Sequence, residues 1–325
     1  MFTDDFIPAE WSAQKALWVA WPSHTELWPG QLLHQARIEI ACMINAVAAH
    51  QPVHIMACGD EARHSADAML HGRIDIADAR FGDIWLRDTG PVFTACGKAL
   101  RFLHNGWGGK YLYAHDDEIG DTIADLAHAQ IIHHPFVLEG GALDHNGQGS
   151  ILTTRQCLLN PNRNNWSEAE AEQALQQAFN ARRIIWLDDG LLKDHTDGHI
   201  DNLARFVGEN TVVCQHGSGN DDPNTLLYDQ TFNALQAAGL DVIQIPSPGL
   251  VHDANGDVMP ASHMNFVISN DVVVVPVYDA ANGDKAVEAI AALFPDRETI
   301  GISSRALLTG GGSFHCISQQ EPAYG

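Results

Sequence analysis

Basic residues are scarce in this sequence. The 325 residues include 18 Lys and Arg against 41 Asp and Glu, which gives a formal net charge of -23 at pH 7. A chain this acidic repels phosphate backbones and anionic lipids, so nucleic acids and membranes are poor partners. The same charge favours a small cationic ligand, although acidity can also serve solubility alone.

The sequence also lacks targeting and disulfide signals. Its N-terminus has no basic region followed by an apolar stretch, and apolar runs such as Val272–Val275 are far shorter than the about 20 residues that span a bilayer. The six cysteines are scattered and form no Cys-x-x-Cys pair, which argues against a disulfide framework and a structural zinc site. We therefore expect a soluble protein of the reducing cytoplasm.

No Pro-, Gly- or Ser-rich linker divides the chain, so we expect one domain over residues 1–325. Short runs rich in Val, Ile and Thr alternate with helical patterns from end to end, which predicts an α/β fold. No repeat is legible, although five helical segments among many short strands would suit a diverged repeated unit. The expected helices are residues 32–49, 117–129, 167–180, 225–238 and 284–294. The expected strands are Leu17–Ala20, Val53–Met56, Val92–Thr94, Ile151–Thr153, Ile184–Leu187, Asn202–Val207, Thr211–Cys214, Val242–Ile245, Asn265–Ile268 and Val272–Val277.

Five segments place polar residues among glycines at the ends of expected strands, where binding and catalytic groups tend to lie. The first is the triple glycine Gly310–Gly312, whose backbone can approach a ligand closely. Cys316 follows it on an irregular turn and lacks the amphipathic context of the other five cysteines, of which Cys42, Cys58, Cys157 and Cys214 are expected to be core residues. A thiolate at Cys316 could act as a nucleophile if a cation or a base lowered its pKa. The alternative is a flexible C-terminal tail with an incidental thiol.

The second segment, Asp194–Asn202, is rich in ionisable groups. On an extended backbone His199 and Asp201 point the same way, because side chains alternate with a period of two. The pair would supply a general acid/base and an anchoring carboxylate. Two alternatives stay open, a solvated polar loop and a metal site built from His195, His199 and Asp201. The metal site is weakened because the residues between the two histidines are poor helix formers, and a zinc pair at this spacing normally needs a helix.

The three other segments are weaker signals. In Phe81–Pro91, Trp85 and Asp88 offer an aromatic face and a carboxylate that suit a cation. The alternative is that Asp88 pairs with its neighbouring arginine or caps a turn. Glu139 precedes a glycine pair, and Asn105–Lys110 contains three glycines. Each of these two predicts only a turn by itself, and no nucleotide-binding pattern is present.

Taken together, these groups suit attack on a positively charged planar carbon such as that of a guanidinium. Two carboxylates would hold its N–H groups in a bidentate manner and fix the central carbon next to sulfur. The charge of the substrate would help to hold the cysteine as a thiolate. A histidine would then give a proton to departing ammonia and later take one from attacking water.

In this order the segments resemble the agmatine deiminase family, relatives of the bacterial peptidylarginine deiminase, over nearly the whole chain. The C-terminal pattern Gly-Gly-Gly-x-x-His-Cys-Ile-x-Gln-Gln is the most specific part of the resemblance. The matching segments are Pro8–Trp11, Trp18–Pro22, Trp85–Pro91, Asn105–Lys110, Glu139–Gly141, Asn160–Arg163, Asp197–Asn202 and Gly310–Gln320.

The resemblance implies a pentein fold, a five-fold pseudo-symmetric α/β propeller of ββαβ-like units with a central active site. It also implies hydrolysis of a guanidinium to a ureido group and ammonia, without a metal or an organic cofactor. Carried over position by position, it makes Cys316 the nucleophile, which forms a covalent amidino thioether, and His199 the general acid/base. Asp88 and Asp201 would grip the guanidinium. The expected substrate-binding residues are Trp85, Glu139, His195 and Gly312.

The resemblance favours agmatine as the substrate, with N-carbamoylputrescine and ammonia as products, and it favours a homodimer. Two residues near the expected substrate channel depart from the family pattern, since His195 stands where many members have Asp and His263 where many have Tyr. They leave open which group the substrate carries at the end away from its guanidinium. Agmatine carries a distal ammonium, and arginine adds a carboxylate that two histidines would tolerate better than Asp and Tyr. Deimination of free arginine or of a C-terminal peptidyl-arginine is therefore an alternative. A non-catalytic metal-binding protein is another, given 18 histidines.

Overall fold

The computed structural model describes residues 6–278 and 280–324. In this part of the chain the strands form one four-stranded and four three-stranded sheets, so the predicted α/β class is confirmed. The first sheet contains β1 (Gln14–Ala20), β2 (Val53–Ala57), β3 (Ile74–Asp78) and β16 (Ser318–Pro322). The other sheets are β4 (Val92–Phe93), β5 (Lys98–Leu103) and β6 (Gln130–Val137); β7 (Asp144–His145), β8 (Ser150–Thr154) and β9 (Arg183–Leu187); β10 (Ala204–Phe206), β11 (Thr211–His216) and β12 (Asp241–Pro246); and β13 (Val267–Ile268), β14 (Val272–Val277) and β15 (Glu298–Ser303).

The five sheets repeat one pairing scheme. In each, a first strand pairs antiparallel with a second, and the second pairs parallel with a third. A parallel pair needs a crossover, and a helix supplies it in every sheet. These helices are α1 (Leu32–Ala48), α5 (Ile119–Leu126), α7 (Glu168–Phe179), α8 (Thr225–Ala237) and α9 (Ala280–Ala291). The chain therefore contains the five ββαβ units that the resemblance implied.

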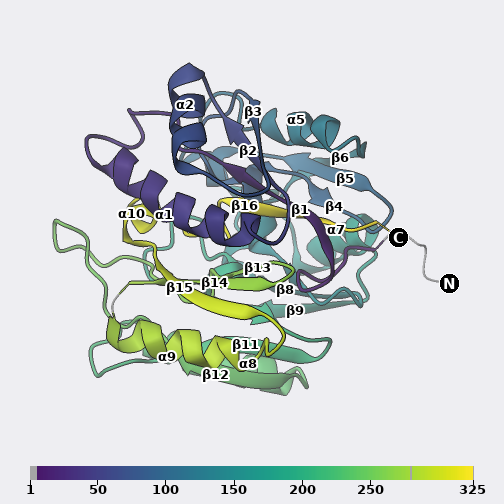
Figure 1. Cartoon of the computed structure of the whole chain (residues 1–325). Helices are drawn as coiled ribbons and strands as arrows, with labels where there is room; N and C mark the ends of the chain where they lie inside the picture. The colour runs from purple at the N-terminus through teal and green to yellow at the C-terminus, as the bar shows by residue number, and fades with distance from the viewer. Residues whose placement is uncertain (1–5, 279, 325) are drawn as a thin grey trace.

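The first of these units is completed by the end of the chain. β16 pairs antiparallel with β1, with Trp18 opposite Gln319 and Val19 opposite Ser318. In Figure 1 the yellow C-terminal strand accordingly lies beside the purple N-terminal strand. This pairing fixes the segment that carries Cys316 against the start of the chain.

The remaining helices are short or peripheral. They are α2 (Asp60–Met69), α3 (Leu86–Thr89), α4 (Gly106–Gly109), α6 (Arg155–Leu158) and α10 (Arg305–Thr309), with 3-10 turns η1 (Gly140–Ala142) and η2 (Ile200–Asn202). α2 and α5 lie near the top of the molecule in Figure 1, whereas α8 and α9 cover the bottom. Several of the shortest elements carry site residues.

The crossover helices bury one apolar face against their sheets. In α1, Ile40, Ile44 and Val47 follow the spacing of one helix face and are fully buried in a cluster with Leu17 and Ile55 of the first sheet. In α7 the Ser167–Glu170 capping box fixes the N-terminus. This packing holds each crossover helix against its sheet and so fixes the strands whose ends carry the site residues.

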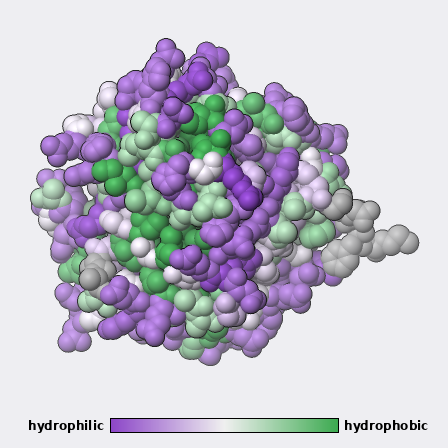
Figure 2. Space-filling model, in the orientation of Figure 1, coloured by the Kyte–Doolittle hydropathy of each residue, from purple (hydrophilic) through white to green (hydrophobic). Residues whose placement is uncertain are grey.

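Hydrophilic residues cover most of the face seen in Figure 2, and hydrophobic residues gather there in smaller patches. Apolar atoms make up a large share of the surface of any folded protein. Within the described ranges, no helix has both the length and the apolar composition needed to cross a bilayer.

Candidate active site

Every sheet presents a site residue just before its first strand. Since the five units repeat one topology, these positions can meet although they lie far apart in the sequence. They are Asp88 before β4, Glu139 before β7, Asp201 before β10, Asn265 before β13 and Cys316 before β16. The contacts described below show that they do converge, as the resemblance implied for Asp88, Asp201 and Cys316.

Cys316 lies on a buried, well-fixed turn and lines a pocket. Its Sγ is 3.0 Å from Asn265 Nδ2 and 3.6 Å from Asp201 Oδ2. Asn265 Oδ1 accepts hydrogen bonds from the backbone N–H groups of His315 at 3.0 Å and Cys316 at 3.2 Å. The alternative of a flexible tail with an incidental thiol is therefore wrong. Asn265 was missed from the sequence, although its place at the start of an expected strand was a usable signal.

The Cys316 thiol lies in an environment that disfavours its charged form. Burial raises its pKa well above the ordinary value, and the carboxylates of Asp201 and Asp88 raise it further. The Asn265 amide acts in the opposite direction. A cation placed between the two carboxylates would offset their effect, because it contributes the opposite charge at the same place.

The two predicted carboxylates are held by different groups. Asp88 accepts hydrogen bonds from Trp107 Nε1 at 2.8 Å and from the Gly141 N–H at 2.9 Å. Oδ2 of Asp201 accepts from His315 Nδ1 at 2.8 Å, and its fully buried Oδ1 has no hydrogen-bond partner. Burial raises the pKa of Asp201, but the hydrogen bond to His315 and the charges of His315, His199 and Arg205 together outweigh burial and leave that pKa lowered. Asp201 therefore offers an unsatisfied, negatively charged acceptor.

His199 is fully buried beside these carboxylates. Its Nδ1 lies 3.8 Å from Asp88 Oδ1. A Cβ atom on Gly141 would lie 2.6 Å from His199 Nδ1, 2.9 Å from Asp88 Oδ1 and 3.2 Å from Asp201 Oδ2. Only glycine therefore leaves room where these three side chains meet. The extended backbone expected here is wrong, since Asp201 belongs to the 3-10 turn η2. The turn nevertheless aims both side chains at one place.

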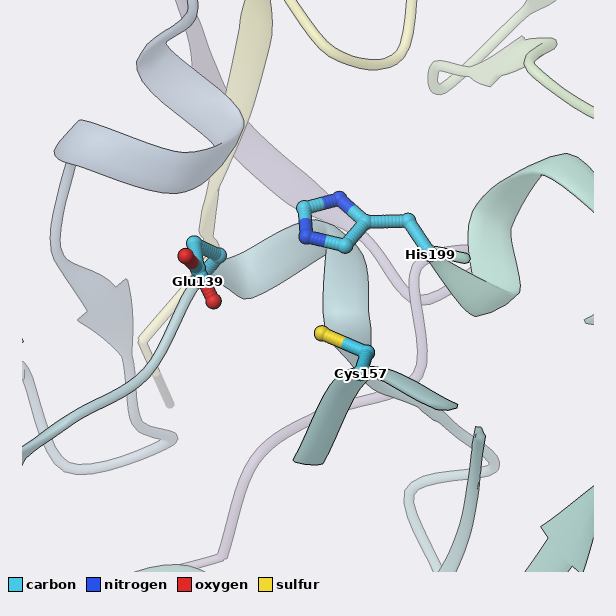
Figure 3. A group of neighbouring side chains, drawn as sticks. All are labelled: Glu139, Cys157 and His199. Atoms are coloured by element: carbon cyan, nitrogen blue, oxygen red, sulfur yellow. The ribbon is translucent and has the colours of Figure 1, made fainter. Parts of the chain in front are cut away.

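The structure corrects the place of Glu139. This residue is fully buried, its Oε1 accepts a hydrogen bond from Arg163 Nε at 2.8 Å, and it does not line the pocket. It lies instead beside His199, together with Cys157, which the sequence marked only as a core residue (Figure 3). Burial lowers the pKa of His199, but Asp88, Cys157 and Glu139 raise it, and the net pKa lies well above the ordinary value.

The metal site considered for His195, His199 and Asp201 does not form. Among the described residues, the one group with ligand atoms close enough to hold a metal ion is Glu139, Cys157 and His199. His195 lies elsewhere, with its Nδ1 2.7 Å from the position that a Cβ on Gly311 would occupy. A solvated polar loop is wrong for the second half of this segment, because His199 and Asp201 are fully buried, whereas His195 in the first half is exposed.

The pocket that reaches Cys316 has an acidic and aromatic wall. Its lining includes Trp85, His195 and Gly312 as expected, and also Asp83, Asp88, Trp107, Tyr111, Tyr113 and Thr196. A Cβ on Gly312 would lie 2.6 Å from the Trp85 ring, which explains a glycine there. None of the described residues that line this pocket is Lys or Arg.

His263 does not reach this pocket, contrary to the expectation that it lies near the substrate channel. It is fully buried, and its Nδ1 contacts the carbonyl oxygen of Pro276 at 2.8 Å. Asp88 does not pair with Arg87 either. The Arg87 guanidinium binds the side-chain oxygens of Gln319 and Gln320, both at 2.8 Å. It thereby ties α3, which carries Asp88, to the strand that follows Cys316.

A buried charge network supports the site from behind. Nε2 of His315 lies 3.1 Å from Glu10 Oε2, and Glu10 forms an ion pair with Arg205. Arg205 Nε also donates to Asp144 at 2.8 Å. The network connects the N-terminal segment with Asp201 through His315, and no role for Glu10 was predicted from its sequence context.

Comparison with known proteins agrees with this geometry. Residues 6–322 match the Porphyromonas-type peptidyl-arginine deiminase family. A Legionella pneumophila protein provisionally named an agmatine deiminase is 34% identical, over 98% of this chain and 94% of that protein. The structure of a cysteine-to-serine variant of C. jejuni agmatine deiminase with substrate bound has a TM-score of 0.92 at 27% identity, and covers 100% of this chain and 98% of that one.

A more distant structure supports the fold alone. DDAH from Pseudomonas aeruginosa, a pentein enzyme, has a TM-score of 0.57 at 14% identity over 95% of this chain and 99% of that one. Together with the five ββαβ units, this likeness confirms the expected pentein fold. The sequence match, the fold and the converging side chains lead to one conclusion: the chain belongs to the Porphyromonas-type peptidyl-arginine deiminase family.

Proposed function

We propose that this protein hydrolyses agmatine to N-carbamoylputrescine and ammonia. The observation that carries the proposal is the convergence of the Cys316 thiol with the carboxylates of Asp201 and Asp88 and the imidazole of His199. A nucleophile, two anionic hydrogen-bond acceptors and a proton carrier are what cleavage of a guanidinium C–N bond requires. The relatives named agmatine deiminases add support from a separate source.

The guanidinium would lie between the two carboxylates. Asp201 has an unsatisfied oxygen, and the fork of guanidinium N–H groups matches carboxylate oxygens in geometry and charge. The Trp85 and Trp107 rings, which also line the pocket, offer faces for the flat cation. This binding would hold the central carbon against the sulfur of Cys316 and avoid most of the entropy cost of bringing the two together.

The first half of the reaction breaks the C–N bond. The bound cation stabilises the thiolate, so Cys316 releases its proton to solvent and its sulfur forms a bond to the central carbon. His199, kept charged by Asp88 at 3.8 Å, gives a proton to the departing nitrogen. Ammonia leaves, and an amidino thioether on Cys316 results.

The second half releases the product. His199, now neutral, takes a proton from a water molecule whose oxygen attacks the same carbon. The C–S bond breaks, the sulfur leaves as a thiolate that regains a proton, and the amidine becomes a ureido group. Glu139 and Cys157 do not touch the substrate in this account; they hold the His199 ring from its buried side.

The pocket wall favours agmatine over arginine. Arginine would bring its carboxylate to a wall that contains Asp83 and, among its described residues, no Lys or Arg. The distal ammonium of agmatine suits the same carboxylate and the neighbouring aromatic rings. His195 is the one histidine of this wall that could bind the arginine carboxylate, whereas His263 is fully buried and does not line the pocket.

We also propose that residues 1–325 act as one catalytic domain in the cytoplasm. All six cysteines are free thiols, which supports a reducing compartment. A homodimer stays a prediction from the resemblance.

Ammonia release from a panel of guanidino compounds tests the proposal. Wild-type protein should release ammonia from agmatine, and Cys316→Ala should release none above background. Cys214→Ala is a matched control, since Cys214 is also fully buried but lies in β11. Equal ammonia release by the Cys316→Ala and Cys214→Ala variants would refute the assignment of the nucleophile.

A further inference from the structure

Three potential metal ligands lie together on the buried side of His199. One ligand atom each of Glu139, Cys157 and His199 lies within 4.8 Å of the other two, and all three residues are fully buried. They come from separate elements, namely the segment before η1, helix α6 and the residue before η2. Figure 3 shows the Cys157 thiol directed toward the imidazole ring of His199, with the Glu139 side chain beside them.

The polar atoms of this group are poorly satisfied by the protein. Oε2 of Glu139 has no hydrogen-bond partner, and the two ring nitrogens of His199 have none of good geometry, their neighbour being the Cys157 thiol. Leaving a buried polar atom unpaired is unfavourable, so buried atoms of this kind are usually paired. Here several such atoms lie close together, so one bound ligand could satisfy them together.

A sulfur, a nitrogen and a carboxylate oxygen are the donors that Zn²⁺ binds in proteins. Bond lengths of about 2.0–2.3 Å in a tetrahedral site place neighbouring ligand atoms roughly 3.4 Å apart. The observed separations are at most 4.8 Å, so the side chains would move inward by about 1 Å or less. The arrangement is thus close to a three-ligand site with one open position.

We propose that Glu139, Cys157 and His199 form a binding site for a thiophilic divalent cation such as Zn²⁺, and that occupation of this site stops catalysis. The cation would take the lone pair with which His199 accepts a proton from water. The inhibition part of the proposal rests on the proposed function, whereas the binding part does not.

The surrounding charges permit entry of a cation. Asp88 lines the pocket and lies 3.8 Å from the His199 ring, so its carboxylate could bind a cation on the way from solvent to Glu139, Cys157 and His199. Arg163 acts against binding, because its guanidinium already pairs with Oε1 of Glu139. Binding must also release the protons of the thiol and of the imidazole to solvent, so affinity should rise with pH. The competition from Arg163 and the required loss of two protons both weaken binding, which favours a reversible inhibitory site over a permanently occupied one.

Cobalt spectroscopy tests the binding part without any activity measurement. Co²⁺ added to the Cys316→Ala variant should give thiolate-to-cobalt absorption and tetrahedral visible bands. These bands should be lost in Cys316→Ala/Cys157→Ala and kept in Cys316→Ala/Cys214→Ala, the matched buried-cysteine control. Bands that survive in the Cys157→Ala background would overturn the site. Circular dichroism and thermal melting should confirm that each variant is folded, and Glu139→Gln is a second probe that should weaken the bands if Cys157→Ala does not fold.

Inhibition by Zn²⁺ tests the functional part. Ammonia release from agmatine is measured over a Zn²⁺ titration, and each variant is normalised to its own metal-free rate. The concentration for half inhibition should rise by at least about tenfold in Cys157→Ala and stay unchanged in Cys214→Ala, and a chelator should restore activity. Unchanged inhibition of Cys157→Ala would place the inhibitory ion on Cys316 and refute the proposal. If agmatine is not a substrate, the cobalt bands still decide the binding question.

Discussion

His315 Nδ1 lies 2.8 Å from Oδ2 of Asp201, and the other nitrogen of the same ring lies 3.1 Å from Glu10. A carboxylate oxygen only accepts hydrogen bonds, so a ring nitrogen that bonds to one acts as the donor. The residue before the nucleophile thus holds one of the two guanidinium-binding carboxylates in place. This relationship gives a role to the N-terminal segment Pro8–Trp11, which matched the family without an evident function.

The first prediction is that Glu10→Gln and His315→Gln weaken substrate binding. A hydrogen bond to a charged group contributes about 1.5–3 kcal/mol, so each change should lower kcat/KM for agmatine roughly 10- to 100-fold. The loss should appear mainly as a higher KM, because Asp201 binds the substrate and does not transfer the proton. Steady-state kinetics and thermal melting of the same samples check this. An unchanged KM in folded His315→Gln would contradict the role of the ring.

The second prediction concerns the reactivity of Cys316. Burial, Asp201 and Asp88 all raise its pKa, so the free enzyme should react slowly with iodoacetamide at neutral pH and faster as pH rises. Asp88→Asn removes one of these carboxylates and should speed alkylation at pH 7 by roughly tenfold, while it abolishes deimination. The alkylated Cys316 peptide is followed by mass spectrometry, because Cys42 and Cys96 are exposed and also react. Slower alkylation in Asp88→Asn would show that the carboxylate does not disfavour the thiolate.

The sequence allowed most of the regular structure to be predicted, because apolar periodicity decided it. The expected strand Val272–Val277 and the expected helix at 32–49 agree with β14 and α1 to within one residue. β16 was missed because its sequence is polar. It is nevertheless fully buried, with Glu321 accepting a hydrogen bond from Trp18 Nε1 at 3.0 Å. Tertiary contacts therefore decide its conformation over local propensity.

The catalytic set could be predicted only where residues stood in distinctive motifs. Cys316 and His199 were found in this way, whereas the roles of Asn265 and Glu10 depend on long-range contacts that only the structure shows. The place of Glu139 could not be predicted for the same reason. Its motif places it near the site, but only the packing against Arg163 shows that it lies behind His199 and not in the pocket wall.

The third prediction concerns stability and Asp116. Burial raises the pKa of Asp116 to about 6, and Asp83 adds to the effect, although backbone N–H groups lower it. Because the folded pKa exceeds the unfolded one, the contribution of Asp116 to stability is complete below about pH 4 and is lost as pH rises through 6. The difference between the folded pKa of about 6 and the ordinary value of 3.8 corresponds to about 3 kcal/mol of folding free energy. Asp116→Asn should therefore be more stable than wild type at pH 7 and approach it at pH 4. Chemical denaturation at both pH values checks this, and a difference that grows toward low pH would contradict it.

The fourth prediction concerns the substrate tail. The pocket wall contains Asp83, and none of its described residues is Lys or Arg, so a substrate carboxylate should be disfavoured. Juxtaposed like charges cost several kcal/mol, which places kcat/KM for agmatine at least about 100-fold above that for arginine. Competition assays with arginine and a C-terminal arginyl peptide measure the ratio. A preference for either arginine compound would restore the alternative substrate. Loss of residual arginine turnover in His195→Ala would then identify His195 as the residue that binds the arginine carboxylate.

The most direct test of the account is the mass of the enzyme during turnover. Wild-type protein mixed with agmatine and quenched in acid should carry an adduct equal to agmatine minus one ammonia, located by peptide mapping on Cys316. Cys316→Ser should carry none and release no ammonia. An adduct on another residue, or turnover that continues in Cys316→Ser, would contradict the central claim that the Cys316 sulfur attacks the guanidinium carbon.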